Sequence, residues 1–270
     1  MSDANHRPAW LKLIHTTLPV MSQAPPTVRQ ALGDFWKREV NRAGWFPATW
    51  SLLSSLWEFL LDSTPARLRQ RYGDTDYDWD HRVNTTRAAV GWRDRLLGTL
   101  HSPYQPTDPA LFHEMLEALT QQASLDLHDF TFLDLGSGKG RTLLMASEYP
   151  FGRIVGVELL PSLDQIAKEN LKRYRSESQK CCAMESICAD ATIFPMPEGP
   201  LLIYLFNPFP EAGLRHFLAN LEHSSSRHPR PVYVLYHNPL LGHVLSAKPF
   251  LHKIAGTHQY SIFTTERDRR

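Results

Sequence analysis

One run of the chain constrains its fold more than any other, and it is Phe132-Leu133-Asp134-Leu135-Gly136-Ser137-Gly138-Lys139-Gly140-Arg141. Residues of strand type lead directly into three glycines spaced two apart, and a helix-forming segment follows. Glycine lacks a Cβ, so a turn of this kind lets backbone N–H groups approach a ligand at the start of a helix. The run therefore predicts a buried strand, a tight turn and a helix, with a ligand at the turn.

The run does not match either common nucleotide-binding pattern. The pattern G-x-x-x-x-G-K-[ST] requires Gly at 133 and Ser or Thr at 140, where Leu133 and Gly140 stand. The dinucleotide pattern G-x-G-x-x-G requires Gly at 141, where Arg141 stands. Asp134 at the base of the turn would repel a phosphate and attract a cationic ligand. The acid and the three glycines together therefore favour a positively charged ligand.

Two further acids follow at the spacing of a parallel sheet. Glu158 closes the apolar run 153–158 and lies 24 positions after Asp134, which leaves room for a helix and a return strand. In a right-handed βαβ unit, Glu158 then reaches the carboxyl edge of the neighbouring strand, where a carboxylate can accept both ribose hydroxyls of an adenosine. Asp190 closes a third strand-like run, 185–189.

Taken together, the acidic-x-G-x-G-x-G run and the two later acids resemble the class I (Rossmann-like) S-adenosylmethionine-dependent methyltransferases, from about Tyr104 to the C-terminus. The resemblance implies an α/β fold with a doubly wound, mostly parallel seven-stranded sheet, and S-adenosyl-L-methionine as cofactor. It also implies cofactor-binding residues, with Glu158 at the ribose and Asp190 at the adenine. The other implied residues are those of the turn: Asp134, Gly136, Ser137, Gly138 and Gly140.

The segment that enters this core carries Tyr104-Gln105-Pro106-Thr107, which resembles the Y-x-P-T motif of several protein-lysine methyltransferases. The resemblance places Tyr104 and Thr107 at the methionine end of the cofactor. The alternative is a proline-rich loop that only joins two parts of the chain. Asp108 and Pro109 are suited to the N-cap and first position of the helix that follows.

From residue 130 onward the pattern alternates between strands and helices. Continuous apolar strands such as 201–206 are typical of a sheet that is covered on both faces. Two closely spaced strands at the end of the chain fit the terminal hairpin of the resembled family. The expected strands are 130–135, 153–158, 185–189, 200–206, 231–237, 250–256 and 258–264, and the expected helices are 140–149, 161–174 and 211–223.

The first hundred residues differ in composition, because all seven tryptophans precede residue 93. The pattern predicts a helix over 27–43, a break at Gly44 and Pro47, a second helix over 50–61 and a polar, acidic loop over 72–80. The second helix is too short to span a bilayer and carries Glu58. We therefore expect residues 1–100 to form a helical, Trp-rich cap with a packed aromatic stripe, and residues 101–270 to form the core.

Candidate catalytic residues follow the fourth and fifth strands of the core. Asn207-Pro208-Phe209 resembles the N-P-P-[YF] motif of amino-methyltransferases with one proline fewer, which implies that Asn207 and Tyr204 orient a substrate amine. The alternative is that Asn207 and Pro208 only cap the strand. His237 ends the next strand, and an ordinary imidazole pKa suits proton transfer near neutrality, although a structural role is the alternative.

Composition narrows the partners. Lys and Arg number 29 against 28 Asp and Glu, so no overall basic charge points to nucleic acid as a partner. The three cysteines fit neither a zinc site nor a disulfide framework, and the first residues lack the apolar core of a signal peptide. We therefore expect a cytoplasmic protein with reduced thiols, without a metal and without a membrane span.

The resemblances described above imply a methyltransferase that acts on the nitrogen of a protein lysine or a small amine. The alternatives are O-methylation of a small molecule with His237 as base, and an inactive S-adenosylmethionine-binding module that serves a partner. A dehydrogenase is disfavoured because Arg141 replaces a required glycine. The sequence specifies neither the acceptor nor the oligomeric state.

Overall fold

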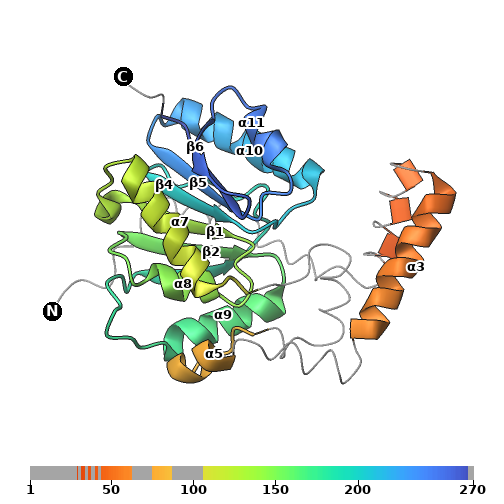
Figure 1. Ribbon diagram of the computed structural model, residues 1–270, viewed down its shortest axis with the longest axis horizontal. Coiled ribbons are helices and arrows are strands. Elements are labelled where there is room, and N and C mark those ends of the chain that lie inside the picture. The colour runs from red at the N-terminus through yellow and green to blue at the C-terminus, as the bar shows by residue number, and fades with distance from the viewer. Residues whose placement is uncertain are drawn as a thin grey trace.

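The computed structural model describes residues 44–62, 75–86 and 106–266, together with residues 29, 32, 33, 36, 37, 40 and 41. Residues 106–266 form an α/β unit around one sheet (Figure 1). The predicted helix over 27–43 falls mostly outside the described residues.

The sheet has seven strands, as predicted, and their order is β3-β2-β1-β4-β5-β7-β6. Neighbouring strands from β3 to β5 are parallel, and β7 is antiparallel to both β5 and β6. The order reverses between β1 and β4, so the carboxyl ends of these two strands flank the point where ligands bind in open α/β sheets. The strands are β1 (Thr131–Leu135), β2 (Arg153–Glu158), β3 (Met184–Cys188), β4 (Leu201–Leu205), β5 (Val232–His237), β6 (His252–Gly256) and β7 (Tyr260–Thr264).

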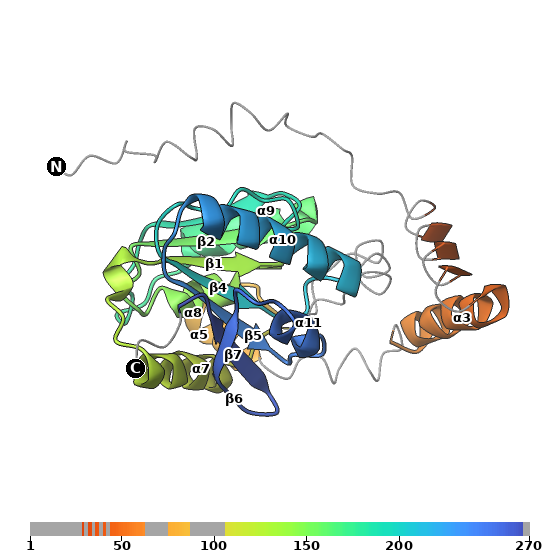
Figure 2. The same ribbon diagram turned by 90° about the horizontal axis from the view of Figure 1, so that it is seen from above.

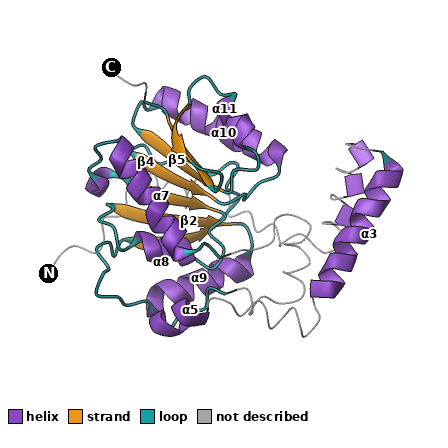
Figure 3. Ribbon diagram, in the orientation of Figure 1, coloured by secondary structure: helices purple, strands orange, loops and turns teal. Residues whose placement is uncertain are grey.

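Each face of the sheet is covered by its own helices (Figures 2 and 3). Alternate residues of each strand point to opposite faces. On one face they pack against α10 (Glu211–Arg227) and α11 (Gly242–Ser246), and on the other against α7 (Pro109–Gln122) and α8 (Arg141–Ala146). The remaining core helix, α9 (Pro161–Arg173), packs against β2 and β3, and a short 3-10 turn, η2 (Leu127–Asp129), precedes β1.

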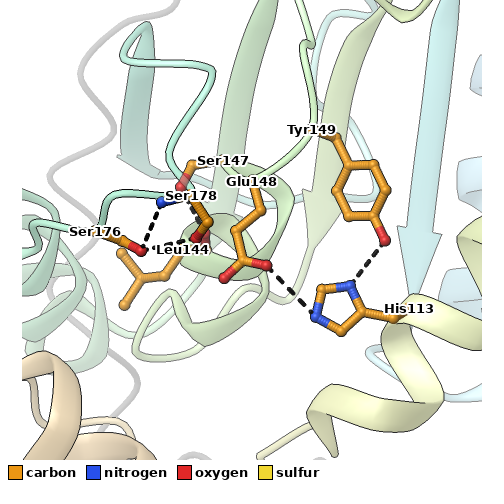
Figure 4. Close-up of polar contacts among 7 residues, drawn as sticks. All are labelled: His113, Leu144, Ser147, Glu148, Tyr149, Ser176 and Ser178. Atoms are coloured by element: carbon orange, nitrogen blue, oxygen red, sulfur yellow. Dashed lines mark hydrogen bonds and ion pairs between the residues drawn. The ribbon is translucent and has the colours of Figure 1, made fainter.

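Helix α7 begins as the sequence predicts. The Asp108 carboxylate accepts a hydrogen bond from the Leu111 N–H at 3.0 Å, and Pro109 takes the first helical position. A second contact fixes α7 against the segment after α8: His113 Nδ1 lies 2.7 Å from the Tyr149 hydroxyl, and His113 Nε2 lies 3.6 Å from a Glu148 oxygen (Figure 4). The helix turns four apolar side chains into the core: Phe112, Met115, Leu116 and Leu119.

The described part of the first hundred residues contains two helices, α3 (Trp45–Asp62) and α5 (Thr75–His81). The predicted break at Pro47 is wrong, because α3 starts directly after Gly44 (φ +91°) and Pro47 lies in its first turn, where a missing N–H costs little. The predicted loop over 72–80 is also wrong, because α5 occupies residues 75–81. Here tertiary contacts of α5 with the core, described below, override a composition that is poor in helix formers.

Helix α3 lies apart from the sheet in both views (Figures 1 and 2). Trp45, Trp50 and Trp57 are each more than half exposed, so the packed aromatic stripe that we expected is not seen among the described residues. No helix in the described ranges is long and apolar enough to cross a membrane.

Candidate cofactor and catalytic site

The glycine turn between β1 and α8 has a backbone that requires glycine. Gly136, Gly138 and Gly140 have φ values of +80°, +54° and +80°, a region that other residues rarely adopt. A Cβ built at Gly136 would lie 2.6 Å from Cβ of Pro208, so the turn also abuts the loop after β4. The turn therefore brings the predicted cofactor site and the predicted acceptor site into contact.

The N–H groups of this turn already donate within the protein. Those of Gly136 and Ser137 donate to the Val157 carbonyl at 2.8 and 3.1 Å, and that of Gly140 donates to the Ser137 carbonyl at 2.8 Å. The Gly138 N–H donates to the Glu158 carboxylate at 2.8 Å. The turn is therefore held in one shape by β2, which favours a preformed site over one that folds around its ligand.

The Ser137 hydroxyl is buried and has no hydrogen-bond partner among the residues that the structure describes. It packs against β2, since a Cβ built at Gly156 would lie 2.6 Å from it, so a contact of Ser137 with a ligand remains a prediction. The glycine cradle and the two acids described next fit the polar, cationic amino-acid end and the ribose of S-adenosylmethionine.

Asp134 lies at the end of β1 and is almost completely buried. Burial raises its pKa to about 7, the nearby charge of Glu158 acts in the same direction, and a hydrogen bond from the Thr142 hydroxyl opposes both. A carboxyl group that is costly to ionise in isolation gains from a bound cation. Asp134 is therefore suited to a cationic group, and its contact with a ligand remains a prediction.

Glu158 ends β2 beside the turn. Its two carboxylate oxygens accept the N–H groups of Gly138 and Leu160, each at 2.8 Å. Burial raises its pKa, and these two hydrogen bonds act against the increase. The carboxylate is thus oriented before any ligand binds.

The third predicted acid is placed differently. Strand β3 ends at Cys188, so Asp190 lies in the following turn, where its carboxylate is exposed and accepts from the Thr192 N–H and hydroxyl at 2.8 and 2.7 Å. Asp190 follows the edge strand next to β2, and its proposed contact with adenine remains a prediction. Tyr104 lies outside the described residues.

Thr107, Tyr204 and His237 form a buried chain of hydrogen bonds at the carboxyl ends of β4 and β5. The Tyr204 hydroxyl lies 2.8 Å from the Thr107 hydroxyl and 2.8 Å from His237 Nδ1. Tyr204 is also the registered neighbour of Asp134 on the adjacent strand, so the chain borders the buried acid. Because Thr107 contacts Tyr204, the entry segment is tied to the core at this point.

The pKa values of His237 and Tyr204 correct the expectation that His237 has an ordinary imidazole pKa. Burial lowers the pKa of His237 to about 4, and its ring stacks on Phe206 at 3.8 Å between centroids. Burial also raises the pKa of Tyr204 well above its ordinary value. His237 is therefore neutral near pH 7 and holds an added proton weakly, so it does not have the ordinary pKa that the sequence suggested for a base.

Asn207 adopts a left-handed backbone (φ +47°), and so does Asn238 after the next strand. The Asn207 amide bridges the two loops: its nitrogen donates to the Asn238 carbonyl at 2.7 Å, and its oxygen accepts from the Tyr236 hydroxyl at 2.8 Å. The amide therefore holds the loops after β4 and β5 together. The alternative that Asn207 only caps strand β4 does not account for these two hydrogen bonds.

The structure thus gathers most of the predicted site at one edge of the sheet. It also adds residues that the sequence analysis missed: Thr142 on Asp134, Tyr236 on Asn207, and Lys139 inside the glycine turn. The repeated Asn-Pro pair at 207–208 and 238–239 was the available signal for paired loops. No group of three or more metal-ligating side chains occurs in the ranges that the structure describes.

The chain has the class I S-adenosylmethionine-dependent methyltransferase fold, defined by the sheet order 3-2-1-4-5-7-6 with an antiparallel β7. No protein-family model matches the sequence, and no curated protein matches it.

Several solved structures are similar to the chain. An RNA methyltransferase from Salinibacter ruber, in complex with S-adenosyl-L-homocysteine, is 22% identical over 59% of this chain and 92% of its own, with a TM-score of 0.39. The human methyltransferase 10 domain containing protein is 12% identical over 74% of this chain and 96% of its own, with a TM-score of 0.44. A predicted N6-adenine-specific DNA methylase from Listeria monocytogenes is 16% identical over 60% and 52%, with a TM-score of 0.42. At these values the similarity carries no information on substrate.

Proposed function

We propose that this protein is an S-adenosylmethionine-dependent methyltransferase that acts on the nitrogen of a protein lysine or a small amine. The observation that carries the proposal is the contact between the glycine turn and the Asn207-Pro208-Phe209 loop at Gly136 and Pro208. A cofactor held at the turn and an acceptor held by this loop would be neighbours, which is the condition for transfer between them.

When bound, S-adenosylmethionine supplies a methyl group that is activated by a positively charged sulfur. In this proposal, Asp134 holds the ammonium group of the ligand and Glu158 accepts the ribose hydroxyls. Charge-assisted hydrogen bonds of this kind contribute roughly 1.5–3 kcal/mol each.

The protein's own part in the reaction is to position and to exclude water. The buried hydrogen bonds among Thr107, Tyr204 and His237 fix the side chains next to Asp134. Asn207 holds the loops after β4 and β5 together. An amine acceptor must lose its proton before transfer, and water can take that proton. The low pKa of His237 argues against the O-methylation alternative with His237 as base, because a group that protonates near pH 4 is a weak base at pH 7.

Binding measurements test the cofactor. Calorimetry with S-adenosylmethionine, S-adenosylhomocysteine and NAD should show binding of the first two only. Asp134→Ala and Glu158→Ala should each weaken S-adenosylmethionine binding by at least about tenfold. Unchanged affinity in both variants would remove the cofactor assignment.

A labelled methyl donor tests the acceptor. Incubation of the protein with the donor and a fractionated extract should place the label in protein or in amine metabolites. Label in nucleic acid would overturn the proposed acceptor, and tight binding without any transfer would favour an inactive module.

A further inference from the structure

The two cations of the glycine turn, Lys139 and Arg141, are buried under a segment more than fifty residues earlier in the chain. This segment comprises α5 and the turn after it, Thr75–Thr86, and we call it the strap. A phosphate-binding loop would direct such a lysine toward its ligand. Here the Lys139 ammonium donates to the Asn84 side-chain oxygen at 2.9 Å and to the Thr86 carbonyl at 2.5 Å.

Asn170 of α9 makes a second connection between the strap and the turn. Its amide pairs with the backbone of Asn84 in both directions, accepting from the N–H and donating to the carbonyl at 2.9 Å each. The same amide nitrogen donates to the Lys139 carbonyl at 2.9 Å. One buried side chain therefore bonds the backbone of the strap and the backbone of the turn.

Hydrogen bonds within the strap hold Asn84 and Thr86 in place for the contact with Lys139. The Asp78 carboxylate accepts the N–H groups of Thr85 and Thr86 at 2.7 and 2.8 Å, and also the Thr85 hydroxyl. Next to Asp78, the Tyr77 ring lies 4.3 Å from the guanidinium carbon of Arg141, so the strap covers the first residue of α8 as well.

We propose that Lys139 and Asn84 are positioning residues for the cofactor, because through them the strap sets the shape of the glycine turn. The path is short: Glu158 bonds the N–H of Gly138, and the next residue, Lys139, bonds the strap. Loss of the strap contact therefore changes the position of the turn relative to the ribose-binding acid. This inference rests on the proposed function, since it requires a cofactor at the turn.

Calorimetry with S-adenosylhomocysteine tests the energetic part. Asn84→Ala and Lys139→Met should each weaken binding by at least about fivefold. The double variant should be no weaker than the poorer single variant, because both remove the same contact. Lys172→Met, an exposed lysine on α9, is the matched control and should bind as wild type does.

Hydrogen exchange separates positioning from simple stabilisation. S-adenosylhomocysteine should slow exchange in peptides covering residues 75–86 of the full-length wild type, although none of these residues is assigned to the ligand. Leu221→Ala, a core variant on the opposite face of the sheet, should lose stability and yet keep this ligand-dependent protection.

The outcomes are distinct. Wild type that does not bind S-adenosylhomocysteine would end the proposed function and this inference together. If wild type binds and Asn84→Ala and Lys139→Met both bind with the affinity of wild type, this inference alone is overturned. Protection confined to residues around 136–140 would overturn it as well.

Discussion

The ionisation of Asp134 makes cofactor affinity depend on pH in a direction that can be worked out. Its pKa of about 7 lies above the ordinary value of 3.8, so the folded protein without ligand holds this group largely protonated at acidic pH. An ammonium ligand binds the ionised carboxylate better, and apparent affinity scales with the ionised fraction. With a pKa of about 7, that fraction rises from roughly 3% at pH 5.5 to roughly half at pH 7, so S-adenosylmethionine affinity should increase roughly fifteenfold over this interval.

Calorimetry across that pH interval measures the effect, and two controls isolate its source. Asp134→Asn keeps the shape of the side chain without the titration, so its profile should be nearly flat and its affinity low throughout. Methylthioadenosine shares the nucleoside and thioether of the cofactor but lacks the amino acid, so its affinity should change little with pH in wild type. A wild-type profile that is flat, or that persists in Asp134→Asn, would refute the assignment of the ammonium to Asp134.

Two further substitutions probe the turn and the buried chain. Gly136→Ala should lower the free energy of unfolding by about 1–3 kcal/mol in denaturant titrations, because φ is +80° and the new Cβ would meet Pro208. The control Gly199→Ala, where nothing lies near the new Cβ, should change the free energy of unfolding little. Equal effects of the two substitutions would contradict the close contact at Gly136. Tyr204→Phe removes the hydroxyl that bonds both Thr107 and His237, so kcat should fall more than cofactor affinity. The control Tyr233→Phe removes a hydroxyl that bonds Glu266 and should leave kcat unchanged. If Tyr204→Phe lowers only the stability, the hydrogen bonds of Tyr204 have a structural role only.

The sequence predicted the sheet well because its signals are local. All seven strands occur within about two residues of the expected runs, since continuous apolar stretches between turn residues mark buried strands without knowledge of their partners. The glycine turn was also predictable, because its conformation excludes other residues.

What the sequence could not supply were contacts between distant residues. Lys139 reads as a cation at a ligand-binding turn, and only the structure shows its ammonium bonded to Asn84. His237 reads as a base with an ordinary pKa, and only its burial beside Phe206 shows otherwise. The helix α5 forms in a stretch of acidic and turn-forming residues because the Tyr77 ring packs on Arg141 and the His81 ring on Tyr174, and these contacts outweigh local propensity.

The strap also bears on how the chain divides. A boundary at residue 100 would separate Asn84 from Lys139 and Asn170, the two residues that it bonds and helps to cover. We therefore propose that the core starts before Thr75 and that the cap is limited to the residues preceding it. On this division, removal of residues 1–74 should spare cofactor affinity, whereas removal of residues 1–90 should weaken it. Calorimetry with S-adenosylhomocysteine on the two truncated proteins tests the boundary. If both bind with the affinity of the full-length protein, the boundary returns to residue 100.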